Sequence, residues 1–139
     1  MAGFGNVLVC SDFSENSNKA FEAAVGLCEG KLVVLHVVAT SYNYDVGEMQ
    51  DKSASTVAKV YGEKAEARMR ELYGKADVEV VVEYGNEAEK ILEVAHDRGA
   101  DVIVMGARGV GFMAGLLGGG SVVNKVVKSA TVPVLVVPA

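Results

Sequence analysis

The feature that most constrains the fold of this chain is an apolar pattern whose period changes repeatedly. Short, almost wholly apolar runs such as 7–9 and 32–38 are typical of strands that are buried on both faces. Between these runs, apolar residues recur every three or four positions, which is typical of helices that bury one face. The sequence therefore predicts alternating strands and helices, and its 139 residues suit one α/β domain.

The predicted elements follow one another as strand, helix, strand. Strands are expected at 6–10, 32–38, 78–84, 101–105 and 134–137, and helices between Ser14 and Gly30, between Ser53 and Gly74, between Ala88 and Gly99, and over 121–130. Helical crossovers imply a parallel sheet covered on both faces, so we expect a single doubly wound domain over 1–139. Valine alternates with charged residues in 78–84, which indicates an edge strand with one solvated face, and the apolar run 134–137 is expected at an edge as well.

Charge and composition exclude several classes of function. The net charge of -5 argues against sequence-independent nucleic-acid binding, which needs clustered basic residues. No apolar stretch reaches the ~20 residues that span a bilayer, and the first residues do not resemble a signal peptide. Two cysteines and two histidines without short ligand spacing do not predict a zinc site. We therefore expect a cytoplasmic protein without nucleic-acid or membrane partners.

A glycine-rich segment follows the predicted fourth strand. Seven of the fifteen residues from 106 to 120 are glycine, and the segment leads into a predicted helix. In open parallel sheets ligands bind beyond the carboxyl ends of the strands, and such a segment can present N–H groups to phosphate. The spacing is neither a Walker A motif nor a dinucleotide-binding motif. By itself it leaves open a phosphate-binding loop or a flexible loop without a ligand.

Several segments together are more specific than the glycine-rich loop. They are Val9–Glu15, Leu35–Val37, Gly85–Ile91, Asp101–Gly106, Gly120–Val122 and Pro133–Val137. These segments are distributed along the whole chain, and through them it resembles the universal stress proteins, in particular their ATP-binding branch. The resemblance implies a five-stranded sheet of order 3-2-1-4-5, ATP with Mg²⁺ or Mn²⁺ as ligand, and a homodimer through the last strand (133–138).

The resemblance also implies a role for individual residues. Asp12, with Ser11 beside it, should lie near the ribose and triphosphate, and Asp12 is a candidate ligand of the metal ion. Val37 should meet adenine through its main chain. The remaining positions expected around the nucleotide, mainly at its phosphates, are Met105, Gly106, Arg108, Gly109, Gly119, Gly120, Ser121 and Val122.

One spacing departs from the family pattern. Ten residues separate Gly109 from the Gly120-Ser121 pair, where the family has nine. Counting nine residues ends at Gly119, but the distance from Gly120 to Pro133 fits the family, so the phosphate role is assigned to Gly120 and Ser121.

The sequence indicates nucleotide binding without efficient catalysis. No Ser/His/Asp or Cys/His arrangement is supported, and His36, within a buried strand, is expected to be a packing residue. Slow hydrolysis or autophosphorylation is not excluded. Two alternatives remain, a nucleotide-independent stress or signalling module and an adenylate-forming enzyme. The second typically has a glycine-containing phosphate loop after the first strand, and here the turn Ser11–Ser14 contains no glycine.

Overall fold

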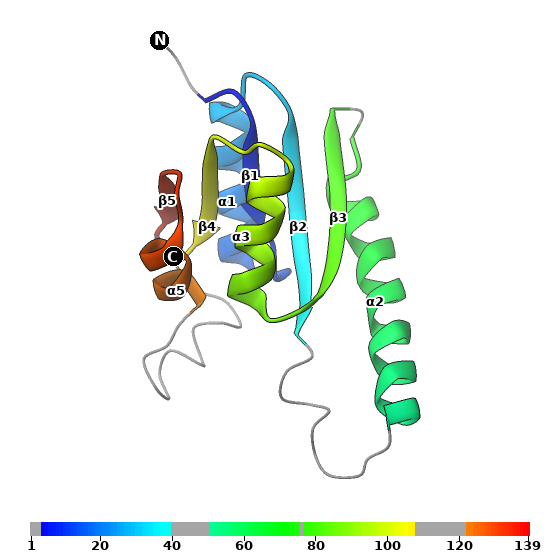
Figure 1. The fold of residues 1–139 in the computed structure, drawn as a ribbon. Coiled ribbons are helices and arrows are strands. Elements are labelled where there is room, and N and C mark those ends of the chain that lie inside the picture. Colours follow the sequence, from blue (N-terminus) through cyan, green and yellow to red (C-terminus); the bar gives the residue numbers. More distant parts are fainter. Residues whose placement is uncertain (1–3, 40–50, 76, 108–121) are drawn as a thin grey trace.

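The protein forms a twisted parallel sheet between two layers of helices (Figure 1). A computed structural model describes residues 4–39, 51–75, 77–107 and 122–139, with the side chains of 51–58 left out. Its strands are β1 (Val7–Cys10), β2 (Leu32–Ala39), β3 (Val78–Gly85), β4 (Val102–Gly106) and β5 (Val134–Val137). They pair in parallel in the order β3-β2-β1-β4-β5. The expected fold class and strand order are therefore confirmed.

Helices cover both faces of the sheet. The described ones are α1 (Glu15–Leu27), α2 (Asp51–Tyr73), α3 (Glu87–Asp97) and α5 (Val122–Ser129). Helices α1 and α2 pack on one face, whereas α3 and α5 pack on the other (Figure 1). In the described part of the chain, no helix is long and apolar enough to cross a membrane.

The core consists of two apolar layers separated by the sheet. Successive side chains of a strand point to opposite faces, so Leu8 of β1 joins the layer under α3 and α5, while Val7 and Val9 join the layer under α1 and α2. All three side chains are fully buried. This burial on both faces explains why the central strands are continuous apolar runs.

Two helix starts agree with side-chain capping. Ser14 caps α1 by accepting a hydrogen bond from the Ser17 N–H at 3.1 Å, a role for which serine is favoured. Asn86 caps α3 in the same way through Glu89. The predicted stop of α1 at Gly30 is too late, because the backbone is already extended at Cys28.

The expectation for residues 78–84 is only half right. β3 is an edge strand as predicted, but helices lie against both of its faces. Val80 and its neighbours Val78 and Val82 pack on the layer under α1 and α2, while Val81 is buried in the opposite layer. Glu79 lies on the α3 side and pairs with Arg98 at 2.9 Å. The charged residue Glu79 thus lies at the margin of a face that α3 covers, and this face is not the solvated one that the sequence predicted.

Candidate functional site

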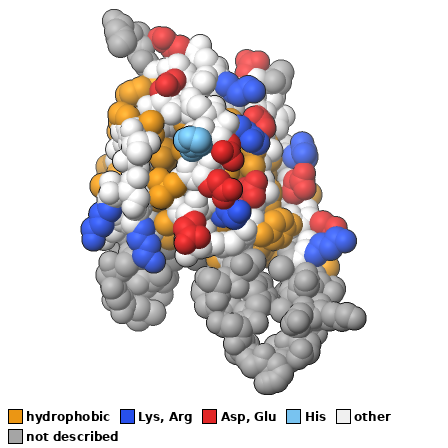
Figure 2. All heavy atoms as spheres, viewed as in Figure 1, with side chains coloured by type: hydrophobic (Ala, Val, Ile, Leu, Met, Phe, Trp, Pro, Cys, Tyr) orange, Lys and Arg blue, Asp and Glu red, His pale blue; other side chains and the backbone are white. Residues whose placement is uncertain are grey.

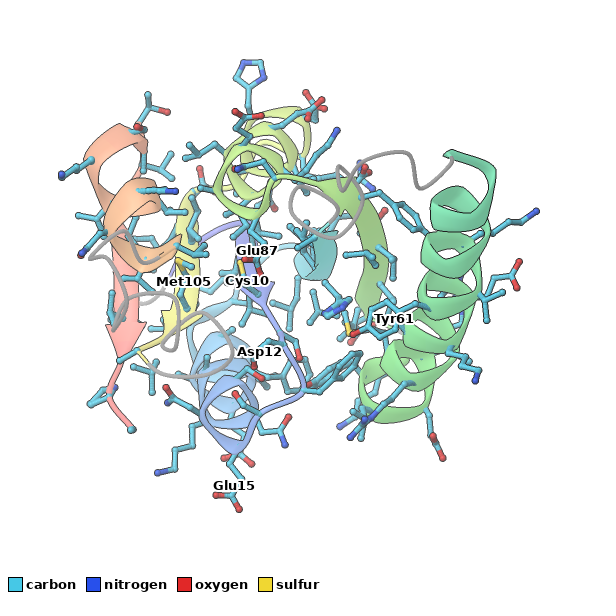
Figure 3. The ribbon with its side chains drawn as sticks, turned by 90° about the horizontal axis from the view of Figure 1, so that it is seen from below. Cys10, Asp12, Glu15, Tyr61, Glu87 and Met105 are labelled. Atoms are coloured by element: carbon cyan, nitrogen blue, oxygen red, sulfur yellow. The ribbon has the colours of Figure 1, made fainter. Side chains whose placement is uncertain are left out.

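The candidate site lies at the carboxyl ends of β1 and β4. These strands are neighbours, with Val9 paired to Val104, and they are the point at which the strand order changes direction. The helix that follows β1 is α1, which covers one face of the sheet, whereas the next described helix after β4 is α5, which covers the other. Strand ends that diverge in this way leave a crevice where doubly wound proteins bind ligands. Figure 3 shows Cys10, Asp12, Glu87 and Met105 grouped at this end of the sheet.

Asp12 lies in the turn that follows β1. It is half-buried, and its Oδ1 accepts a hydrogen bond from the Ser14 N–H at 3.0 Å. Its charge raises the pKa values of both Cys10 and Glu87, so the carboxylate lies within electrostatic range of both groups. The turn thus holds a negative charge at the switch point, as the sequence predicts.

Glu87 is a second carboxylate at this edge, which the sequence analysis missed. It is the first residue of α3 and is half-buried. Burial raises the pKa of Glu87, Asp12 raises this pKa further, and Lys125 on α5 lowers it. Figure 2 shows acidic side chains gathered over α3 and basic ones over α5. The signal was available, because residues after β3 lie at the same edge as those after β1, β2 and β4.

Cys10 and Met105 form an apolar floor beneath these carboxylates. Met105 is 5% exposed, and Cys10 packs against the same core layer. Burial, with smaller contributions from Glu87 and Asp12, raises the pKa of Cys10 to about 12. The thiol is therefore protonated at neutral pH and behaves as a small apolar group.

Val37 presents its main chain to the same edge. β1 pairs with β2 only as far as Leu35, whose carbonyl accepts a hydrogen bond from the Ser11 N–H at 2.9 Å. Backbone groups of alternate residues point to the same neighbouring strand, so those of Val37 also point to the β1 side, beyond the last paired residue. The Val37 side chain is buried in the core. Contact between the main chain of Val37 and a ligand stays a prediction.

Ser11 is oriented away from Asp12. Its hydroxyl is buried and shares hydrogen bonds with Tyr73 Oη at 2.9 Å and with the Phe13 N–H at 3.1 Å. Its carbonyl accepts a hydrogen bond from Nδ1 of His36 at 2.8 Å. The structure thus places Ser11 beneath the site as a support, and its contact with a ligand stays a prediction.

His36 is buried, as expected of a packing residue. Its ring lies 4.6 Å from the ring of Phe13, and in the described residues its Nε2 has no hydrogen-bond partner. Burial lowers the pKa of His36. Because the Ser11 carbonyl requires a proton on Nδ1, the neutral imidazole carries that proton and leaves Nε2 unprotonated.

Phe13 has a backbone conformation that the sequence does not reveal. Its φ is 71°, and it has the one positive φ among the described residues other than glycine. A left-handed non-glycine residue costs roughly 1–3 kcal/mol and persists where its surroundings fix it. Such strain directly after Asp12 indicates that the turn is held by contacts of the Phe13 ring.

Gly106 ends β4 and closely approaches α1. A Cβ there would lie 2.9 Å from Cγ and Oδ1 of Asn16 and 3.1 Å from its carbonyl oxygen. The absence of a side chain at 106 therefore has a packing reason in addition to the predicted phosphate contact.

The other predicted phosphate-binding residues divide into two groups. Val122 begins α5 and packs half-buried against the core. The rest lie outside the described residues: Arg108, Gly109, Gly119, Gly120 and Ser121.

Fold and strand order together define a doubly wound α/β protein whose switch point lies between β1 and β4. The chain belongs to the universal stress protein family, whose model matches residues 3–138. It is 34% identical over 139 residues to a universal stress protein of Thermus aquaticus, covering 96% of this chain and 98% of the relative.

Two solved structures share the fold over nearly the whole chain. UspA from Lactobacillus plantarum is 25% identical with a TM-score of 0.82, and 99% of each chain is covered. A universal stress protein solved in complex with cAMP is 23% identical with a TM-score of 0.60, and 98% of each chain is covered.

Proposed function

We propose that this protein binds ATP at the carboxyl ends of β1, β2 and β4 and acts as a nucleotide-dependent regulatory switch. The observation that carries this proposal is the main chain of Val37, which points to the β1 side beyond the last paired residue, where the Asp12 turn follows β1. Main-chain groups there are suited to the edge of adenine, and the Asp12 carboxylate to ribose hydroxyls. The glycine-rich segment after β4 supplies the predicted phosphate contacts.

A divalent cation fits the charge of this edge. In the described residues no group of three or more His, Cys, Asp and Glu side chains forms a metal site. Mg²⁺ is commonly held by one or two carboxylates together with nucleotide phosphates, and Asp12 with Glu87 nearby can supply that number. When bound, the ion would offset the repulsion between these carboxylates and the triphosphate. We therefore assign the cation to Mg²⁺ or Mn²⁺ that enters with ATP.

The two histidines of the chain support binding with at most slow hydrolysis. His36 is buried and hydrogen-bonded to the Ser11 carbonyl, and His96 is an exposed residue of α3 beside Asp97. Efficient hydrolysis needs a base that contacts the attacking water. Nδ1 of His36 is engaged by the Ser11 carbonyl and His96 is exposed, so we assign this role to neither histidine.

A homodimer through β5 completes the proposal. β5 is an edge strand, with Leu135 39% and Val136 36% exposed. An exposed apolar edge favours pairing with a second chain, and a two-fold axis would place two copies of β5 side by side. Pro133 and Pro138 flank the strand and would limit the pairing to a short segment.

The ligand can be identified without assuming it. We expect acid extraction of the purified protein to release an adenine nucleotide detectable by chromatography and mass spectrometry. The same extraction from Gly109→Val should release none, because a side chain on the predicted loop would displace phosphate, while the circular dichroism spectrum should be unchanged. An extract in which both proteins yield equal amounts of nucleotide would refute the assignment of the loop.

A further inference from the structure

The strained Phe13 is the feature that nucleotide binding alone does not explain. Its ring has two close neighbours: the centroid of the His36 ring lies 4.6 Å from its own centroid, and the guanidinium carbon of Arg68 lies 4.7 Å from it. A turn residue with φ of 71° is most easily a glycine, so a large side chain there is retained against a conformational cost. The contacts of the ring offset this cost.

Helix α2 contacts the same turn through two of its residues. Arg68 lies over the Phe13 ring, and Tyr73, the last residue of α2, shares a hydrogen bond of 2.9 Å with the Ser11 hydroxyl. That hydroxyl in turn accepts a hydrogen bond from the Phe13 N–H at 3.1 Å. Asp12 therefore lies between two residues that are both held by α2.

We propose that Phe13 is a positioning residue that fixes the Asp12 turn to helix α2 and thereby holds the Asp12 carboxylate at the nucleotide-binding edge. This inference rests on the proposed nucleotide site and specifies how its first strand end is held in place. It also makes α2 the element whose displacement would alter Asp12. By thermodynamic linkage, a nucleotide that binds more tightly when the turn is fixed would stabilise the packing of α2 on the turn by the same free energy.

The test compares four variants with the parent protein. Phe13→Ala removes the ring and keeps the strained backbone, Phe13→Tyr keeps the ring, and Arg68→Met removes the cation above it. Phe4→Leu is the matched control, because Phe4 is a half-buried aromatic residue that packs against the same core layer but precedes β1 and lies outside the turn.

Two quantities are measured for each variant: the dissociation constant for ATP, and amide hydrogen exchange at Ser14, whose N–H donates to Asp12 Oδ1. We expect Phe13→Ala to weaken ATP binding about tenfold, which corresponds to ~1.4 kcal/mol, and to accelerate Ser14 exchange in the nucleotide-free protein. Phe13→Tyr should restore both values. Phe4→Leu should lower the unfolding midpoint and leave both values unchanged.

The outcomes separate this inference from the proposed function. If the parent protein does not bind ATP, the proposed function fails, and Ser14 exchange still tests whether Phe13 fixes the turn. If Phe13→Ala does not fold, Arg68→Met should still accelerate Ser14 exchange. Ser14 exchange at the parental rate in Phe13→Ala would overturn the inference, and if that variant does not fold, a parental rate in Arg68→Met would do so. An equal effect of Phe4→Leu would also overturn it.

Discussion

Replacing Gly106 with alanine should destabilise the fold through Asn16. The new Cβ would lie 2.9 Å from the Asn16 side chain, which is buried and donates to the carbonyls of Val137 and Pro138 at 3.2 Å each. Displacing the amide puts at risk two hydrogen bonds worth about 0.5–1.5 kcal/mol each, and crowding a packed site costs about 1–3 kcal/mol. Since these effects overlap, we expect a loss of about 2–4 kcal/mol.

A double-mutant cycle with Asn16→Ala tests this reasoning by urea unfolding without nucleotide. Removing the amide takes away the two nearest contacts of the new Cβ and leaves that of 3.1 Å with the Asn16 carbonyl, so Gly106→Ala should cost about 1–2 kcal/mol less in that background. Gly26→Ala is the matched control, because a Cβ at this helical glycine meets nothing within 4 Å and should stabilise by up to about 1 kcal/mol. An equal cost of Gly106→Ala in both backgrounds would refute the packing explanation.

Three further predictions concern charge, reactivity and assembly. Burial and Asp12 raise the pKa of Glu87, so the folded protein keeps the Glu87 proton at pH values where the unfolded chain loses it. The contribution of Glu87 to stability is therefore lost as pH rises from 4.5 through the raised value. We therefore expect the unfolding midpoint of Glu87→Gln to rise relative to that of the parent as the pH increases above 4.5. A difference between the two midpoints that does not change with pH would contradict this. Cys10, with its pKa raised to about 12, should resist iodoacetamide at pH 8 until the protein unfolds, as peptide mapping would reveal, and rapid labelling of the folded protein would disprove it. Leu135→Lys should shift light scattering from dimer towards monomer with ATP binding largely retained, whereas a monomeric parent would exclude the β5 interface.

The fold could be predicted well because the burial of each strand or helix determines the apolar pattern within its own short segment of sequence. The continuous apolar run of β2 reflects a strand covered on both faces, and Ser14 caps α1 because its side chain reaches an N–H only three residues away. The edge position of β3 followed from its charged residues. The charged residues do not mark a solvated face, as was predicted, since Glu79 pairs with Arg98 at the margin of a face that α3 covers.

The candidate site was only partly predictable, because several of its contacts join distant residues. Asp12 was found because it directly follows a strand, and Glu87 would have been found by the same rule applied to β3. The link from Asn16 to Val137 spans 121 positions, and the surroundings of the Phe13 ring depend on how α2 packs. Neither arrangement leaves a periodic signal in the sequence.

Equilibrium titration of the nucleotide-free protein with ATP, GTP and AMP, each with Mg²⁺, tests the central claim most directly. Recognition through the main chain of Val37 and the Asp12 turn predicts one ATP bound per chain, with GTP at least tenfold weaker because its purine edge presents different donors and acceptors, a difference of ~1.4 kcal/mol. Absence of ATP binding at millimolar ligand, or equal affinity for GTP, would contradict the account.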